Sequence, residues 1–211
     1  MKKIKILIAD DHTVVRRGLE QIIAETPDIV VTGEASNGWE VLDKVSNGNY
    51  DEVILDIAMP GKDGMEVLNQ IKHEKPGLPV LILSMYPEEQ FAVRALRSGA
   101  SGYLTKESAP DELVSAIRKV STGGKYISSA LAEKLAFLLQ NMERPLHEAL
   151  SDREYKVMCL IASGKTVTEI ANELSLSIKT ISTYRSRVLE KMNLKNNAEL
   201  THYAIKNQLV Y

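Results

Sequence analysis

Cysteine is almost absent from this chain of 211 residues, in which Cys159 is the only one. A single thiol can form no disulfide within the chain, and it cannot supply the several cysteine ligands of a structural zinc site. Cys159 lies in the apolar run 157–161, which we interpret as part of a helix. We therefore expect Cys159 to be a buried packing residue.

Long hydrophobic runs are also missing. The first apolar run, residues 4–9, follows basic residues as a signal peptide would, but it is too short and it meets Asp10 and Asp11. No stretch approaches the roughly 20 apolar residues that a membrane-spanning helix needs. With 44% hydrophobic and 26% charged residues, the composition is typical of a soluble protein with one large domain or two small ones. We expect a cytoplasmic protein without a membrane partner.

The chain also lacks a strong excess of either charge, since its formal net charge is −2. The charges are nevertheless unevenly distributed. Residues 151–211 carry 9 basic and 6 acidic side chains, a net +3, and the preceding 150 residues carry 17 and 22, a net −5. A modestly basic C-terminal module is compatible with nucleic-acid binding, although a net charge of this size can arise on any small domain.

Short apolar runs are present, and they alternate with segments of helical spacing. The runs are residues 4–9, 29–31, 53–55, 80–83 and 103–104. Such alternation predicts βαβ units. Five strands and five helices within about 120 residues predict one α/β domain with a five-stranded, doubly wound parallel sheet. We place this domain at residues 1–122.

Polar residues follow four of the five predicted strands. Asp10 and Asp11 follow the first, Asp56 the third, Ser84 the fourth and Lys106 the fifth. The carboxyl ends of parallel strands meet at one edge of the sheet, where ligands bind. Three clustered carboxylates repel one another, and a divalent cation held by oxygen ligands, Mg²⁺ in particular, would neutralise them. Beside such a cation and an ammonium group, Asp56 is a candidate nucleophile for phosphoryl transfer.

Each of these residues has an ordinary structural alternative. Asp11 or Asp56 could cap a helix or loop, Ser84 could bond to the backbone, and Lys106 could be a solvated charge. Their joint placement at the strand ends favours one shared site.

The first domain resembles a known family through these residues and their neighbours. The motifs are Asp10-Asp11, Asp56 followed by Met59-Pro60-Gly61 and Asp63-Gly64, Ser84, and Tyr103-Leu104-Thr105-Lys106. They resemble the flavodoxin-like receiver domain of two-component response regulators, from residue 1 to about 122.

The resemblance implies a role for each site residue. Asp56 would accept phosphate from a sensor histidine kinase, and Asp11, Asp56 and the Ala58 carbonyl would bind Mg²⁺ directly while Asp10 assists through water. Ser84 and Lys106 would bind the oxygens of the phosphoryl group. Tyr103 would swing inward as the switch. Ala58 stands at a position that tunes dephosphorylation in this family, so the lifetime of the phosphorylated state stays open.

Residues 123–149 connect this domain to the next. Ser121-Thr122-Gly123-Gly124 breaks the preceding helix, and leucines at helical spacing predict a connecting helix over about 130–142. Pro145 prevents its continuation, so we place the interdomain linker at about 141–149, with His147 as a solvated residue in it.

Residues 150–211 predict four helical segments. Ser151 and Glu154 form a capping box for the first, Gly164 ends it, and Ser177 caps the third after a short second helix and a tight turn. The third helix is expected to bury Ile178, Ile181, Val188 and Met192. The second and third helices predict a helix-turn-helix, although by pattern alone such a pair is more often an ordinary αα-hairpin.

The motifs of this module carry a second resemblance. Leu150-Ser151-Asp152-Arg153-Glu154, Leu160–Gly164, Glu169-Ile170-Ala171, Leu174 and Ser177–Ile181 resemble the LuxR-type helix-turn-helix. Behind a receiver, this module is the arrangement of the NarL/FixJ group of transcriptional regulators.

The second resemblance also implies residue roles. Three residues would face base edges in double-stranded DNA: Ser182, Thr183 and Ser186. Five would be candidates for phosphate contact: Lys179, Thr180, Arg185, Arg187 and Lys191. Three on a last helix over about 198–205 would pair two modules: Leu200, Tyr203 and Ala204. Such a homodimer, formed on phosphorylation, would require an inverted-repeat operator. Ser182 and Tyr184 depart from the Lys and His common in the family, which leaves fewer cations at the groove.

These expectations combine into a phosphorylation-controlled transcriptional regulator rather than an enzyme. A phosphohydrolase of the haloacid-dehalogenase type would need a second aspartate two positions after Asp56, where Ala58 stands. A constitutive or partner-controlled DNA-binding regulator with an unresponsive receiver is the main alternative.

Overall fold

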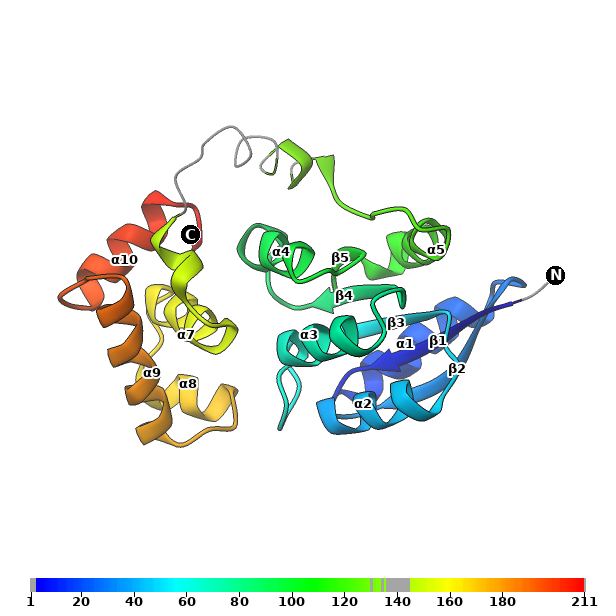
Figure 1. Cartoon of the computed structure of the whole chain (residues 1–211), viewed down its shortest axis with the longest axis horizontal. Coiled ribbons are helices and arrows are strands. Elements are labelled where there is room, and N and C mark those ends of the chain that lie inside the picture. The colour runs from blue at the N-terminus through cyan, green and yellow to red at the C-terminus, as the bar shows by residue number, and fades with distance from the viewer. Residues whose placement is uncertain (1–2, 130, 134, 136–144, 211) are drawn as a thin grey trace. The chain divides into compact units, whose positions relative to one another are not determined.

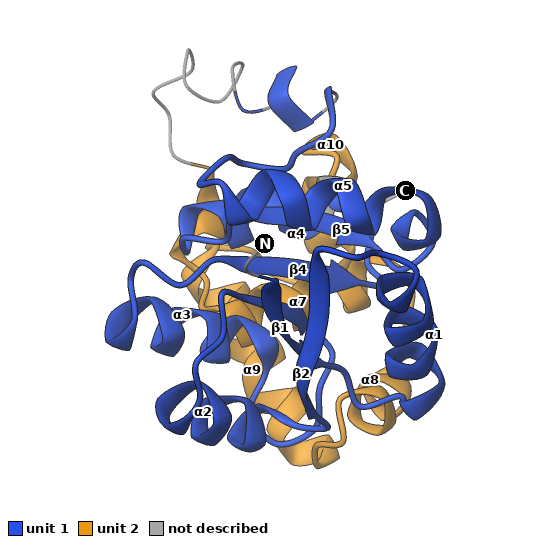
Figure 2. Ribbon diagram, turned by 90° about the vertical axis from the view of Figure 1, so that its right-hand side faces the viewer, with its two compact units in different colours: residues 1–135 blue, residues 136–211 orange. Residues whose placement is uncertain are grey.

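The computed structural model describes residues 3–129, 131–133, 135 and 145–210. The chain divides into two compact units, residues 1–135 and 136–211, which Figure 2 shows in different colours. Among the described residues, no helix combines the length and the apolarity that crossing a membrane requires.

The first unit is built on a parallel sheet. Its strands are β1 (Ile4–Ala9), β2 (Ile29–Ala35), β3 (Glu52–Asp56), β4 (Val80–Ser84) and β5 (Gly102–Thr105), in the spatial order β2-β1-β3-β4-β5 (Figure 1). All pairs are parallel, and Ile54 of β3 lies opposite Ile8 of β1 and Leu81 of β4. The predicted five-stranded doubly wound domain is confirmed, and each strand includes the apolar run from which it was predicted.

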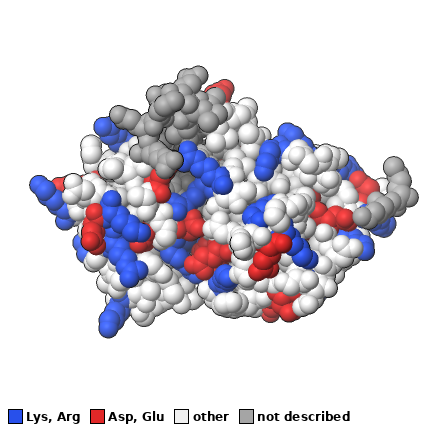
Figure 3. Space-filling model, viewed as in Figure 1, with Lys and Arg blue, Asp and Glu red and all other residues white. Residues whose placement is uncertain are grey.

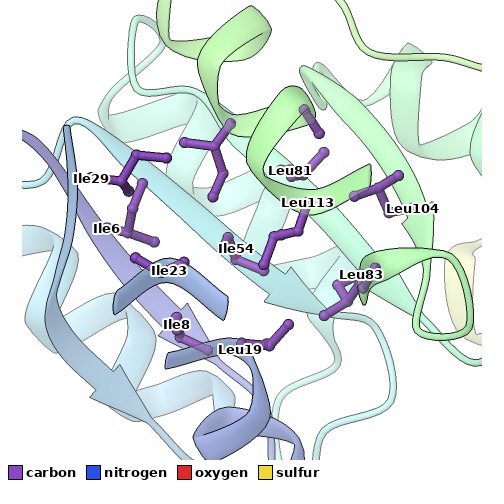
Figure 4. Packing of buried hydrophobic residues seen from close by; sticks show 13 residues of the cluster. Ile6, Ile8, Leu19, Ile23, Ile29, Ile54, Leu81, Leu83, Leu104 and Leu113 are labelled. Carbon is purple, nitrogen blue, oxygen red and sulfur yellow. The ribbon is translucent and has the colours of Figure 1, made fainter. Parts of the chain in front are cut away.

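Helices cover both faces of this sheet, as Figures 1 and 2 show. One face carries α1 (Thr13–Ala24) and α5 (Ala109–Ser121), and the other carries α2 (Gly38–Asn47), α3 (Gly64–Glu74) and α4 (Glu88–Arg97). Figure 4 shows the core beneath α1 and α5, where Leu19 and Leu113 pack against Ile8 and Ile54. Because both faces are covered, β3 and β4 are buried along their whole length and read as continuous apolar runs.

Residues 125–128 continue to contact the first unit beyond α5. Tyr126 forms an isolated parallel bridge with Gly102, donates its N–H to the Ser101 carbonyl at 3.0 Å and accepts the Tyr103 N–H at 3.2 Å. The exposed edge of β5 is thereby covered. The domain boundaries that we predicted at residues 122 and 149 stay predictions. Much of the predicted connecting helix, including Leu138, Leu139 and Met142, lies outside the described residues.

The second unit consists of helices. They are the 3₁₀ helix η1 (Leu146–Ala149), α7 (Asp152–Ala162), α8 (Val167–Glu173), α9 (Ile178–Lys191) and α10 (Asn197–Lys206). The predicted capping box is confirmed, since the Ser151 hydroxyl accepts the Glu154 N–H and Glu154 reaches back to the Ser151 N–H. Ser177 caps α9 as predicted, and Cys159 is buried in α7.

Candidate acidic site and nucleic-acid interface

Three aspartates and one histidine converge at the carboxyl ends of β1 and β3. Asp10, Asp11, His12 and Asp56 each offer a ligand atom within 4.8 Å of the others. The three carboxylates were predicted from their strand-end positions. His12 was left out of the predicted ligands, yet its Nδ1 lies 2.7 Å from an Asp11 oxygen. Its place directly after two site aspartates was the available signal.

Asp56 sits at the end of β3 with both oxygens engaged. Oδ1 accepts the Ala58 N–H at 3.0 Å, and Oδ2 accepts a hydrogen bond from Lys106 Nζ at 2.8 Å. The loop that follows packs tightly beneath it, because a Cβ on Gly64 would lie 2.1 Å from the Asp56 carbonyl oxygen. Glycine is therefore required at position 64 for the chain to return under the site.

Lys106 lies between two buried carboxylates. Its Nζ is 2.6 Å from Asp10 Oδ2 and 2.8 Å from Asp56 Oδ2, and all three side chains are largely withdrawn from solvent. Burial raises the pKa of Asp56, and the Lys106 charge opposes that rise. Burial also acts to lower the pKa of Lys106, but the Asp56 and Asp10 carboxylates outweigh it, so the pKa of Lys106 is raised. The ammonium group is therefore held in its charged form.

The donor atoms fit a hard divalent cation. Lys106 supplies one positive charge against the three carboxylates, so the cluster needs more positive charge than its lysine provides. Two buried carboxylate oxygens face nitrogens within the cluster: Asp10 Oδ2 lies 2.6 Å from Lys106 Nζ, and Asp11 Oδ1 lies 2.7 Å from His12 Nδ1. Carboxylate oxygens of this kind are the ligands that Mg²⁺ prefers.

Ser84 and Tyr103 both bond to the backbone of Tyr86. Ser84 Oγ accepts the Tyr86 N–H at 3.1 Å, and the Tyr103 hydroxyl donates to the Tyr86 carbonyl at 2.8 Å. The Tyr86 ring packs on Phe91 of α4, with centroids 4.8 Å apart. Tyr103 was predicted to swing inward on phosphorylation; here its side chain is already inside, with 2% of the residue exposed.

The second unit contains the predicted helix-turn-helix. Helices α8 and α9 are joined by a short turn in which Ser175 takes a left-handed conformation, φ 53°. Helix α9 buries Ile181 and Val188 and exposes a largely polar face. Five predicted DNA-contact residues lie on that exposed face: Lys179, Ser182, Thr183, Ser186 and Arg187.

The other three predicted phosphate contacts are engaged within the unit. Arg185 is half-buried and donates through Nε to Asn197 Oδ1 at 2.6 Å. Lys191 donates to the buried Glu154 carboxylate at 2.6 Å, which ties α9 to α7. The half-buried Thr180 shares a hydrogen bond with the Ser177 hydroxyl at 2.7 Å. A phosphate contact by Lys191 would require its ion pair with Glu154 to break.

Three expectations for this unit were wrong. Ile178 was expected in the core but is 54% exposed. Leu200 and Ala204 are fully buried in their own unit, so they cannot touch a second subunit directly. His147 is not a free linker residue, since its Nδ1 lies 2.9 Å from the half-buried Tyr203 hydroxyl. The exposed face of α10 instead presents other residues, among them Ala198, His202 and Ile205.

Basic and acidic side chains are mixed on the face shown in Figure 3, with no large area of one sign.

Residues 6–118 match the family model of the response regulator receiver domain, and residues 148–204 match that of bacterial regulatory proteins of the luxR family. The chain is 37% identical to the response regulator UvrY of Escherichia coli K12, over 98% of this chain and 95% of that protein. It is 35% identical to the response regulator GacA of Pseudomonas aeruginosa, over 98% of each. The solved complex of the response regulator RcsB with DNA is similar in structure, with a TM-score of 0.61, 27% identity and coverage of 97% and 98%.

Proposed function

This chain belongs to the two-component response regulators of the NarL/FixJ group, with a receiver domain and a LuxR-type DNA-binding domain, and we propose that phosphorylation of Asp56 controls its binding to promoter DNA. The observation that supports the proposal most directly is the position of Asp56, held against Lys106 and beside two further carboxylates at the end of the central strand.

In this proposal, an Asp56 carboxylate oxygen attacks the phosphorus of a phosphohistidine on a sensor kinase. The O–P bond forms as the N–P bond breaks, and the kinase imidazole is the leaving group. Lys106 and Ser84 bind the phosphoryl oxygens. Asp11, Asp56 and the Ala58 carbonyl would hold Mg²⁺ directly, with Asp10 acting through water. When bound, Mg²⁺ neutralises negative charge on the transferring oxygens.

We further propose that the new phosphoryl group is sensed through Ser84. The Ser84 hydroxyl accepts a hydrogen bond from the Tyr86 N–H, and the Tyr86 carbonyl accepts one from the Tyr103 hydroxyl. A movement of Ser84 toward the phosphoryl group therefore shifts the Tyr86 backbone and alters its hydrogen bond with Tyr103. Helix α4 follows this loop directly. The face around α4 and β5 is therefore the surface that we expect to respond.

The output in this proposal is DNA binding by a dimer. Ser182, Thr183 and Ser186 face base edges, while Lys179 and Arg187 contact phosphates, aided by Thr180 and Arg185. Pairing of two modules uses the exposed face of α10, since Leu200 and Ala204 are buried. A two-fold symmetric dimer binds an inverted repeat.

The test is phosphoryl uptake by Asp56→Asn, measured as a mobility shift on Phos-tag gels with a phosphodonor. We expect no shift in this variant, and a normal shift in Asp43→Asn, which changes an exposed aspartate on α2. Full labelling of Asp56→Asn would refute the assignment.

One observation favours a second candidate function. Because Tyr103 is already inside, an inward swing is not available to it as a signal. A regulator that binds DNA constitutively or under the control of a protein partner would fit this arrangement. DNA affinity that is the same with and without beryllofluoride would favour it.

A further inference from the structure

Ile178 is an exposed isoleucine at the first helical position of α9. It is 54% exposed, whereas Ile181 and Val188 of the same helix are completely buried. The helix begins at Ile178 because the Ser177 hydroxyl accepts the Thr180 N–H at 3.1 Å, which fixes the first turn. The side chain therefore contributes little to the core of the unit and is available for contact with a ligand.

The position of Ile178 places it where a helix-turn-helix meets bases. In this motif the residues near the N-terminus of the second helix reach base edges in the major groove. Ile178 also lies one turn before the exposed Ser182, and Ser182 one turn before the exposed Ser186, so the three residues form one row along the helix. In a helix-turn-helix docked in this way, an apolar side chain at the N-terminal end of such a row would face the groove.

The neighbouring hydroxyls are partly committed to their own helix. The Thr183 hydroxyl donates to the Lys179 carbonyl at 3.0 Å, and the Ser186 hydroxyl donates to the Ser182 carbonyl at 3.1 Å. While these bonds persist, both residues offer only acceptor lone pairs to a ligand. Among the exposed α9 residues predicted to contact DNA, none is an asparagine or glutamine that could read adenine with two hydrogen bonds. Discrimination by this face must then draw on other contacts.

The 5-methyl group of thymine is the apolar feature of the major-groove code. We infer that Ile178 reads a thymine by packing against this methyl group. The inference rests on the proposed DNA binding and adds a specificity-determining residue to it. Loss of one methyl contact corresponds to roughly a fourfold change in affinity for each half-site.

The experiment uses the full-length protein and a DNA duplex that wild type has selected from a random pool. Affinity is measured at one fixed salt concentration for this duplex and for versions in which one symmetric pair of thymines at a time is replaced by deoxyuridine, which lacks the methyl group. For wild type, we expect one symmetric pair of substitutions to weaken binding of the dimer by roughly 15-fold, because each of the two half-sites loses about fourfold. For Ile178→Ala, we expect the thymine duplex to bind as weakly as the deoxyuridine duplex does to wild type, with no further loss on deoxyuridine.

Two variants serve as controls. Leu146→Ala truncates a residue of η1 that is 49% exposed, and it should leave the preference for thymine unchanged. Thr183→Ser removes the other methyl group on the exposed face, so a preference that disappears in this variant and persists in Ile178→Ala would overturn the inference. Equal affinity of wild type for thymine and deoxyuridine at every position would also overturn it. If no duplex is enriched at all, the proposed DNA binding itself fails, and the inference fails with it.

Discussion

At the scale of single residues, the acidic site depends on one lysine shared between two buried carboxylates. Lys106 contacts Asp10 and Asp56 at 2.6 and 2.8 Å, and each of these aspartates is 1% exposed. Breaking a buried ion pair on one side leaves an uncompensated charge, which is more costly than the net value of the pair. The same two carboxylates are candidates for binding a cation, so lysine and metal should substitute for each other in stabilising them.

We expect Lys106→Met to lower the free energy of unfolding of the first unit by about 3 kcal/mol without metal. Added Mg²⁺ should recover more stability in the variant than in wild type, because it replaces the missing charge. Urea titrations with and without Mg²⁺ measure this. Trp39, the only tryptophan, lies in α2 and reports on the first unit alone. Lys3→Met, at an exposed position, is the control; equal Mg²⁺ effects in all three proteins would contradict the prediction.

A second residue-scale prediction concerns Glu52. Both of its carboxylate oxygens are buried without a hydrogen-bond partner, and burial raises its pKa from the ordinary 4.5 to about 9. Between these values the folded protein keeps a proton that the unfolded chain has lost. The stability contributed by this proton is complete below about pH 4.5 and is lost as the pH rises toward 9, by at most about 1.4 kcal/mol per unit.

We expect Glu52→Gln to flatten the pH dependence of unfolding between pH 6 and 8, because glutamine does not titrate. Its unfolding free energy should exceed that of wild type increasingly as the pH rises. Urea titrations at three pH values, followed by Trp39 fluorescence, provide the comparison. Parallel pH profiles for the two proteins would show that Glu52 is solvated or paired in solution.

At the scale of elements, strand β5 depends on the segment that covers its edge. Tyr126 bridges Gly102, its hydroxyl donates to Glu112 of α5 at 2.9 Å, and Lys125 Nζ donates to the Ala100 carbonyl at 2.6 Å. A Cβ on Gly102 would lie 2.7 Å from the Tyr126 carbonyl oxygen and 2.9 Å from Leu81 Cδ1. Glycine is thus required at position 102 for this segment to lie against the strand.

We expect Gly102→Ala to destabilise the first unit by roughly 1–3 kcal/mol through overpacking. Faster amide hydrogen exchange at Tyr103 and Tyr126 should accompany the loss, because the bonds between the two segments weaken. Gly18→Ala is the matched control. Its added Cβ meets no atom within 4 Å, and alanine is favoured over glycine inside a helix, so α1 should gain roughly 0.5–1 kcal/mol. Unchanged exchange at both tyrosines in Gly102→Ala would contradict the account.

At the scale of the whole molecule, the acidic site and the helix-turn-helix lie in two different compact units. The receiver holds the acidic site, and the second unit holds the helix-turn-helix. The interface of a dimer has to be formed by residues that the monomer leaves exposed, and Ile205, 55% exposed on α10, is the largest apolar candidate on that helix.

We expect beryllofluoride with Mg²⁺ to shift wild type toward a dimer in sedimentation velocity and to tighten its binding to DNA. Asp56→Asn should neither dimerise nor bind DNA more tightly with beryllofluoride, because it lacks the carboxylate oxygen to which beryllium binds. Ile205→Asp should still be phosphorylated but should dimerise more weakly on DNA, since a charge in an apolar interface is costly. Dimerisation of Ile205→Asp at the wild-type level would exclude this face of α10.

The sequence alone determined the order of strands and helices in the receiver and the set of polar residues at the strand ends. Periodicity and strand-end position follow from local spacing, so Asp56 and Lys106 could be named as neighbours although 50 positions separate them. The helix caps were predictable for the same reason, since Ser151 and Ser177 act within three residues of their own positions.

Only the tertiary structure decided which of the remaining side chains are free. Helical spacing placed Ile178 on the apolar side of its helix, but it is 54% exposed. The family resemblance placed Leu200 at an interface between subunits, but it is buried within its own unit. Lys191 was predicted to contact DNA, but it is paired with Glu154, 37 positions away in the sequence. His147 was predicted to be solvated, but it contacts the Tyr203 hydroxyl, 56 positions away. Burial and pairing depend on contacts between elements distant in sequence, which local spacing does not contain.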